Sequence, residues 1–258
     1  MIFDTHSHLF SEEFDNDREE CLQRCKELGM KLMLVGYSHI GNEKAYKLAQ
    51  LSNNFYCSAG IHPDQASQDY EIDVKKLDNF LKNHKVQALG EIGLDYHYDD
   101  GPKKEYQIPL FKLQMDLAVK YNLPVIIHTR DAWMDTLNIL SQYAGKVVCI
   151  MHCYSGSLEM AKEFIKMGFY IAIGGAVTFK NSKEIKRVCA NIDIDKMLIE
   201  TDCPYITPTP YRGKRNESAY IKYTIEEIAK IREISQVEVE NITYNNACKA
   251  FNLTEEIK

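Results

Sequence analysis

Eight short apolar runs recur along the chain, and they constrain its fold more than any other feature. They begin 23 to 36 residues apart, and most of the segments between them carry apolar residues at helical spacing. The runs are nearly continuous and rich in β-branched residues, as in strands that are buried on both faces of a parallel sheet. They occupy residues 2–3, 31–35, 55–60, 88–92, 124–127, 147–151, 170–173 and 197–199.

This alternation of strands and helices predicts a TIM (β/α)8 barrel of the α/β class, formed by a single domain over residues 1–258. A doubly wound open sheet is the alternative, but eight strands favour closure. Helices are predicted at 18–28, 107–121, 158–167 and 220–234, and a last helix at 237–251 is expected to pack outside the barrel. No linker or low-complexity segment divides the chain.

The composition excludes several classes of protein. Apolar residues make up 45% of the chain and charged residues 26%, as in an ordinary globular protein, and no run approaches the roughly 18 apolar residues of a membrane span. The start of the chain lacks a signal-peptide pattern, and eight cysteines without a CxxC motif indicate reduced thiols. We therefore expect a cytoplasmic monomer with no membrane partner. The net charge of −6 argues against a surface that coats DNA non-specifically.

Histidines and carboxylates gather where the predicted strands end. Because the carboxyl ends of barrel strands converge on one face, these side chains are expected to meet in one pocket. Side chains two residues apart on a strand share a face, so His6 and His8 are predicted to point together toward the barrel axis. The residues at strand ends are His6, His8, His62, Glu91, His128, His152, Glu200 and Asp202.

Such a cluster would be costly to bury unless cations compensated its charge. Imidazole nitrogens and carboxylate oxygens suit zinc and manganese, and magnesium favours carboxylates. One ion is saturated by about four ligands. The larger set therefore predicts two divalent ions (Mg, Mn or Zn), with Glu91 as the bridge between them. An HxH pair alone would be weak evidence for metal binding. The prediction rests on all of these residues occurring together at strand ends.

Seven motifs resemble, in chain order, the signatures of the TatD family of metal-dependent deoxyribonucleases. They are DTHSHL, GIHP, GEIGLDY, IIHTRDA, MHCYSG, ETDCPY and RGKRNE, and the resemblance extends from residue 2 to about residue 250. The resemblance implies a metallo-dependent hydrolase barrel with two ions. One ion would be held by His6, His8, Glu91 and Asp202, and the other by Glu91, His128 and His152.

The resemblance also implies roles around the ions. Glu91 and Asp202 would be catalytic, with Asp202 as the base or orienter of the attacking water. The substrate would contact His62, Arg130, Arg212 and Arg215, and the ligands would be supported by Glu200, Asp95 and Asp4. Ser218 departs from the family pattern, in which proline commonly follows RGKRNE. We expect this change to loosen the start of the last barrel helix without removing activity.

The predicted activity is hydrolysis of DNA phosphodiester bonds, as a 3′–5′ exonuclease that uses water activated by two metals. The alternative is an amidohydrolase or phosphotriesterase acting on a small molecule. Many of those enzymes bridge their metals with a carboxylated lysine after the fourth strand, whereas GEIGLDY carries Glu91 and no lysine. A non-enzymatic binding barrel is disfavoured by the intact ligand set. Lys183, Lys186 and Arg187 lie next to strand-end segments and could meet a phosphate backbone, but we favour their interpretation as ordinary solvated cations.

Overall fold

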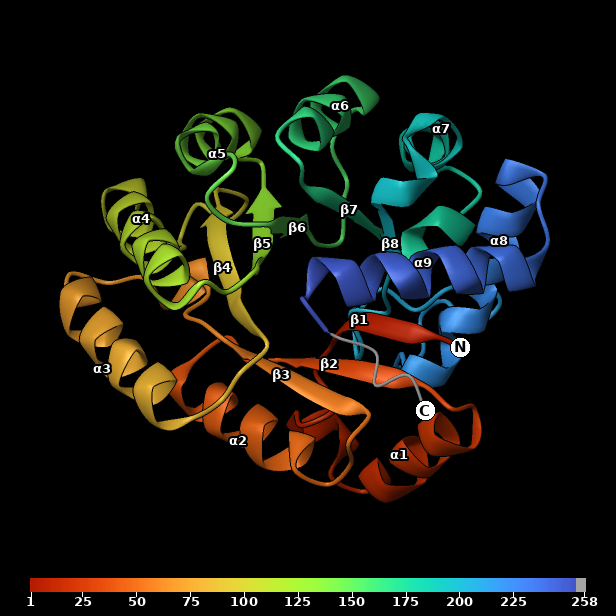
Figure 1. The fold of residues 1–258 in the computed structure, drawn as a ribbon, viewed down its shortest axis with the longest axis horizontal. Coiled ribbons are helices and arrows are strands. Elements are labelled where there is room, and N and C mark those ends of the chain that lie inside the picture. Colours follow the sequence, from red (N-terminus) through yellow and green to blue (C-terminus); the bar gives the residue numbers. More distant parts are fainter. Residues whose placement is uncertain (254–258) are drawn as a thin grey trace.

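The computed structural model describes residues 1–253, so the last five residues of the predicted domain, 254–258, lie outside the described part. Eight parallel strands form one sheet in the order β1 to β8, and helices surround it (Figure 1). The predicted TIM barrel is confirmed. The strands are β1 (Phe3–Ser7), β2 (Lys31–Val35), β3 (Phe55–Ala59), β4 (Ala88–Asp95), β5 (Val125–Arg130), β6 (Cys149–Met151), β7 (Tyr170–Ile173) and β8 (Met197–Ile199).

The α-helices follow the strands in alternation, and short 3-10 helices lie in several loops. Serine side chains begin some of the α-helices: Ser235 accepts from the Glu238 N–H, and Glu238 bonds back to it in a capping box at the start of α9. The α-helices are α1 (Arg18–Glu27), α2 (His39–Ala49), α3 (Tyr70–Asn83), α4 (Lys104–Tyr121), α5 (Trp133–Leu140), α6 (Leu158–Lys166), α7 (Lys183–Asn191), α8 (Ile221–Arg232) and α9 (Gln236–Ala250). The 3-10 helices are η1 (Glu12–Phe14), η2 (Pro63–Gln65), η3 (Ser141–Tyr143), η4 (Gly175–Thr178), η5 (Ile194–Lys196) and η6 (Ser218–Tyr220).

None of the helices in residues 1–253 is both long and apolar enough to span a bilayer.

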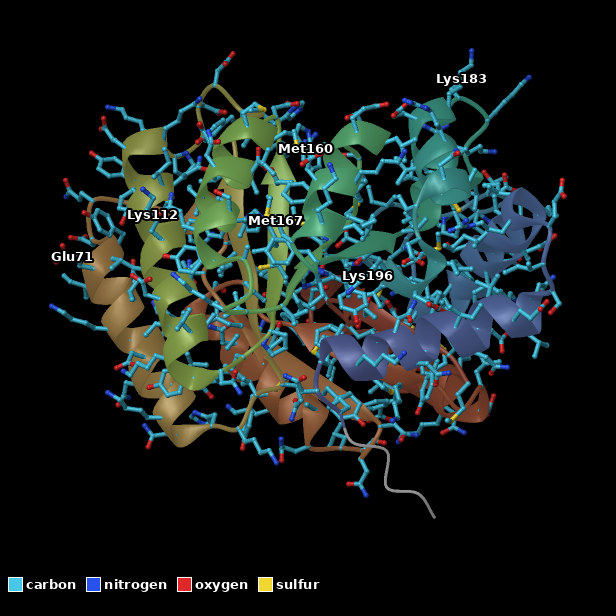
Figure 2. All side chains as sticks on the ribbon, turned by 45° about the horizontal axis from the view of Figure 1, so that its top comes forward. Glu71, Lys112, Met160, Met167, Lys183 and Lys196 are labelled. Atoms are coloured by element: carbon cyan, nitrogen blue, oxygen red, sulfur yellow. The ribbon has the colours of Figure 1, made fainter. Side chains whose placement is uncertain are left out.

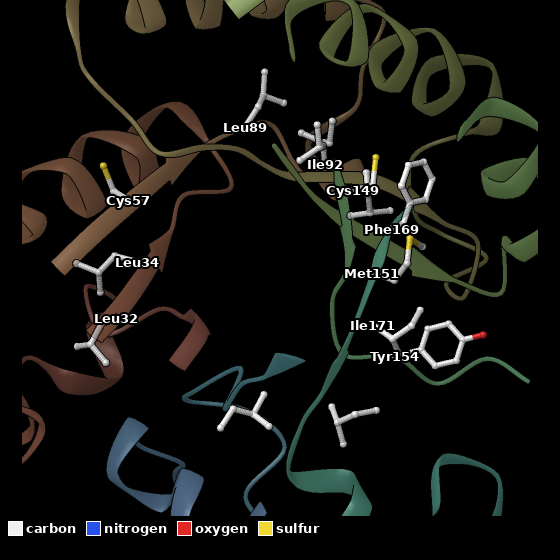
Figure 3. Packing of buried hydrophobic residues seen from close by; sticks show 14 of the residues in the cluster. Leu32, Leu34, Cys57, Leu89, Ile92, Cys149, Met151, Tyr154, Phe169 and Ile171 are labelled. Atoms are coloured by element: carbon white, nitrogen blue, oxygen red, sulfur yellow. The ribbon is translucent and has the colours of Figure 1, made fainter. Parts of the chain in front are cut away.

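The strands pack apolar side chains on both faces. On β2, Leu32 and Leu34 belong to the main core cluster, and Met33 and Val35 belong to a second cluster inside the barrel. This alternation follows from the two-residue period of a strand. Figure 3 shows members of the main cluster on several strands around the ring, among them Leu32, Leu89 and Ile171.

Helix α9 lies outside the ring of strands and covers the amino-terminal end of the barrel. Its residues Tyr244 and Ala247 and the adjoining Phe251 join the interior cluster, and the Phe251 and Phe3 rings lie 5.8 Å apart. Figure 1 shows α9 crossing in front of the strands. The apolar face of α9 is buried there against side chains at the starts of the strands, which would otherwise face solvent. The opposite end of the barrel, at the carboxyl ends of the strands, stays uncovered by α9 and carries the candidate metal centre.

The first and last strands are joined mainly by the residues that follow β8. The Asp202 N–H donates to the His6 carbonyl, and the His8 N–H donates to the Cys203 carbonyl, both at 2.9 Å. Asp4 is fully buried at this junction. Its carboxylate accepts from the Thr201 N–H at 2.9 Å and from the Thr201 hydroxyl at 2.6 Å. Burial, opposed by these bonds, raises the Asp4 pKa to about 7.

Candidate metal centre

Irregularities in β1 and β4 turn two predicted ligands into the barrel. On β4, Leu89 and Ile92 both pack outward in the main core cluster, which regular alternation over three residues would not allow. The register with β5 shifts between these residues, and Glu91 faces inward as a result. The register of β1 with β2 shifts in the same way between Asp4 and Ser7, just where His6 lies. Both irregularities therefore aim a side chain at the site.

Four side chains bring one ligand atom each into a compact group. His6 Nε2 lies 3.1 Å from His8 Nε2, 3.4 Å from Glu91 Oε2 and 3.7 Å from Asp202 Oδ1. His8 Nε2 lies 3.7 Å from Glu91 Oε2 and 3.6 Å from Asp202 Oδ1. Ligands about 2.0–2.1 Å from a tetrahedral zinc ion are separated by roughly 3.3–3.4 Å. The spacing of these four atoms fits one such ion.

A second group forms around the other carboxylate oxygen of Glu91. Glu91 Oε1 lies 2.9 Å from both His128 Nδ1 and His152 Nε2, and these two nitrogens are 3.4 Å apart. His62 Nε2 lies 3.5 Å from the same oxygen. The two oxygens of one buried carboxylate therefore face different sets of imidazoles, which is the arrangement that a bridging ligand requires.

Hydrogen bonds behind the imidazoles determine which ring nitrogen faces the group. The Val35 carbonyl lies 2.8 Å from His8 Nδ1 and accepts its proton, which leaves a lone pair on Nε2. Asp95 Oδ2 lies 3.0 Å from His128 Nε2, so Nδ1 of that ring faces Glu91. Glu200 Oε1 lies 3.5 Å from His152 Nδ1 as an electrostatic neighbour and makes no hydrogen bond with it. Imidazole nitrogens and carboxylate oxygens thus converge on two small groups, and this donor set fits a divalent metal.

The charge state of the ligands suits metal binding. Burial raises the pKa of Glu91, but the charges of His152 and His62 and hydrogen bonds from His128 and His152 outweigh it and hold the pKa well below its ordinary value. Burial and the nearby His152 lower the pKa of His6, so its ring is neutral. Burial raises the pKa of Asp202, but His8 and the neighbouring histidines lower it more. Both carboxylates are thus ionised at neutral pH.

The glycines that flank Glu91 allow β4 to approach β5 closely. Gly93 has φ +150°, and a Cβ at this position would collide with the His128 carbonyl. Gly90 has φ +145°, and its Cβ would lie 2.7 Å from the Ile126 carbonyl oxygen. The GEIG sequence therefore places Glu91 and His128 side by side, because neither flanking position tolerates a side chain.

A cavity of about 750 Å³ opens above the two groups at the carboxyl ends of the strands. His62 and Arg130, both predicted to contact substrate, line it together with Glu91, His128 and Asp202. Burial lowers the pKa of His62, but Glu91 and Asp64 raise it more, to about 10, so the ring is positively charged. Arg130 is exposed, and its guanidinium donates to the Tyr98 hydroxyl at 3.2 Å.

Arg212 and Arg215 do not line this cavity. The Arg215 guanidinium donates to both oxygens of Asp17 at 2.6 Å and lies 4.4 Å from the centre of the Phe14 ring. Arg212 lies over the Phe179 ring at 4.2 Å. The loop after β8 therefore turns Arg215 toward Asp17 and Phe14, and Arg212 toward Phe179. Both arginines had been predicted to contact the substrate. Ser218 is fully buried and begins η6, directly before α8.

Several cavity residues were not among the predicted site residues. Tyr37 follows β2, and its ring meets that of His8 edge-on at 5.4 Å. Asp64 lies 2.9 Å from His62 Nδ1, and Lys183 lies at the start of α7. The signal for Asp64 was present, since it follows His62 by two residues in GIHPD. Tyr37 lies in the loop after β2 and Lys183 follows the loop before α7, and no periodicity predicts the paths of these loops.

The family is decided by a match over nearly the whole chain. Residues 3–252 match a family model described as TatD related DNase. The chain belongs to the TatD family of metal-dependent hydrolases. It is 43% identical over 255 residues to the metal-dependent hydrolase YabD of Bacillus subtilis, covering 98% of this chain and 100% of that protein.

Other TatD relatives share this full-length match. The metal-dependent hydrolase YcfH of Escherichia coli is 32% identical over 265 residues, covering 98% of this chain and 96% of YcfH. YabD and YcfH are both described as uncharacterized. The crystal structure of YJJV, a TatD homologue from Escherichia coli K12, superposes with a TM-score of 0.90 at 28% identity over 98% of each chain. The TatD resemblance drawn from the motifs is thereby confirmed.

Proposed function

We propose that this TatD protein hydrolyses DNA phosphodiester bonds as a 3′–5′ exonuclease and uses two divalent ions, Mg, Mn or Zn. The observation that carries the proposal is the arrangement around Glu91: Oε2 faces His6 and His8, and Oε1 faces His128 and His152. The family description as a DNase supports the choice of substrate. Cytoplasmic location and a monomeric state remain predictions.

The ligand residues would hold the ions as two groups that share Glu91. The first group is His6, His8, Glu91 and Asp202, and the second is Glu91, His128 and His152. Divalent ions bound there would acidify a water molecule and stabilise negative charge on the phosphoryl oxygens. Asp202 lines the cavity as an ionised carboxylate, so it can accept the proton of the attacking water.

His62 supplies positive charge on another wall of the same cavity. Its protonated ring is positioned by Asp64 at 2.9 Å and can donate to a non-bridging phosphoryl oxygen. Arg130 adds a guanidinium at the rim, where a phosphate can be bound by two parallel hydrogen bonds. These cations compensate locally for the acidic net charge of the whole chain.

One assay tests the proposal. Single- and double-stranded oligonucleotides labelled at the 5′ end are incubated with metal-free protein plus Mg²⁺, Mn²⁺ or Zn²⁺, and the products are separated by length. We expect a ladder that shortens one nucleotide at a time from the 3′ end, only with added metal, and absent in Asp202→Asn. Intact oligonucleotides with every metal, together with turnover of small amides or phosphotriesters, would favour the small-molecule alternative instead.

A further inference from the structure

The walls of the active-site cavity differ in charge. On the side of β3 the wall carries Asp64, whose carboxylate lies 2.9 Å from the protonated ring of His62, so the two charges offset each other. At the end of β5 the wall carries Arg130, and at the start of α7 it carries Lys183. A polyanion that reaches the metal groups therefore meets cations without offsetting partners among the described residues at the rim that carries Arg130 and Lys183.

Lys183 has no acidic partner among residues 1–253, although its neighbours on α7 do. Lys186 pairs with Glu227 at 2.6 Å, and Arg187 pairs with Glu159 and Glu184. Glu184 also lines the cavity, but its carboxylate accepts from Arg187 and from the Leu158 N–H. Figure 2 shows the Lys183 side chain projecting from the end of α7, beyond the body of the barrel. The charge of Lys183 is thus available to a ligand in the cavity.

We propose that Lys183 binds the phosphate next to the one being hydrolysed, so that the substrate strand leaves the cavity over the rim formed by Arg130 and Lys183. The inference rests on the proposed function and adds to it the path by which the substrate DNA strand leaves the cavity. For Lys183 it selects the phosphate contact, which the sequence had left open beside the interpretation as a solvated cation. Lys183 is a substrate-binding residue here and does not touch the reacting atoms.

The volume of the cavity is consistent with a substrate longer than one phosphate group. Cavities of 300–1,000 Å³ hold whole small-molecule ligands, and this one has about 750 Å³. It extends from Glu91 and His128 to Asn181, Ser182 and Lys183. A neighbouring phosphate in its outer part would meet an exposed ammonium group, and that contact would be independent of base sequence.

The test compares substrates that have and lack a neighbouring phosphate. Bis(4-nitrophenyl) phosphate contains a single phosphodiester, and a single-stranded decanucleotide contains several. For Lys183→Ala we expect the KM of the decanucleotide to rise about three- to tenfold, its kcat to stay within twofold, and its salt-dependence slope to fall by about 1. The kcat/KM for bis(4-nitrophenyl) phosphate should stay within about twofold of the wild type.

Lys112→Ala is the matched control, because Lys112 is an exposed lysine on α4 that does not line the cavity (Figure 2). It should leave both substrates unaffected. Unchanged decanucleotide kinetics in Lys183→Ala would overturn the inference while leaving the proposed function intact, and so would an equal loss on both substrates. If the wild-type protein cleaves bis(4-nitrophenyl) phosphate but no oligonucleotide, the proposed DNase function fails and the inference fails with it.

Discussion

His128 Nε2 lies 3.0 Å from Asp95 Oδ2, and this contact turns the Nδ1 atom of the same ring toward Glu91. A carboxylate behind a ligating histidine fixes the tautomer and increases the basicity of the ligating nitrogen. Asp95 is itself positioned, because it accepts from the His97 N–H at 2.9 Å. Asp95, the aspartate of the GEIGLDY motif, therefore supports the metal centre by orienting His128.

Replacing Asp95 by Asn should weaken metal binding without unfolding the barrel. Loss of such a carboxylate typically lowers metal affinity about 10- to 100-fold. Titration of the metal-free variant with Zn²⁺ or Mn²⁺ measures the change. Asp131→Asn is the control, because Asp131 holds His97 at 2.7 Å on the exposed rim and contacts none of the ligands. Equal affinities in the two variants would show that Asp95 does not support His128.

Gly93→Ala should destabilise the protein more than the same substitution at a glycine that has positive φ but open space around it. The added Cβ would meet the His128 carbonyl, so β4 and β5 must separate. Gly29→Ala is the control, because Gly29 has φ +62° and a Cβ added there would have no atom within 4 Å. We expect about 1–2 kcal/mol for Gly29→Ala and roughly a further 1–3 kcal/mol for Gly93→Ala. Urea unfolding measures both, and equal losses would contradict the steric account.

Asp78 should make the protein sensitive to acid. Hydrogen bonds from Lys120 at 2.6 Å, Lys82 at 2.7 Å and Tyr121 at 2.6 Å hold the pKa of this carboxyl below its ordinary value. The folded state therefore binds the proton less readily than the unfolded state, whose pKa is about 3.9. The stabilisation is complete above about pH 5 and is lost as the pH falls below about 4.

The unfolding free energy of metal-free wild-type protein should therefore exceed that of Asp78→Asn by about 1 kcal/mol at pH 6. The difference is small because Asp78 and its lysine partners are partly solvated. The difference should shrink at pH 3. Glu71→Gln removes the same charge from α3, where Glu71 has no ion pair within residues 1–253, and should show no such trend. A pH-independent gap between wild type and Asp78→Asn would contradict the pKa argument.

The ligands that follow regular strand alternation were the easiest to predict. On β5, Ile126 faces the interior and Ile127 the outer core, so His128 faces inward by simple parity. The position of Glu91 required a register irregularity that no spacing rule announces. Its inclusion in the predicted site came from the strand-end pattern and from the GEIGLDY resemblance.

The loops were harder to predict, because tertiary contacts determine their paths. RGKR was expected at the substrate, yet the Arg215 guanidinium is held by Asp17 and packs on Phe14 near the start of the chain. The sequence left open whether Lys183 meets phosphate or only solvent, and the structure places it in the lining of the cavity. Helix α9 was recognised as a helix, but only the packed barrel shows which surface its apolar face covers.

The most direct test of the account is a calorimetric metal titration of metal-free wild-type protein and Glu91→Gln, with circular dichroism to verify folding. If Glu91 bridges two ions, the wild type should bind two Mn²⁺ or Zn²⁺ per chain, and the variant should lose high-affinity binding at both positions together with phosphodiesterase activity. A folded Glu91→Gln variant that binds two ions with wild-type affinity and cleaves DNA at the wild-type rate would contradict the account.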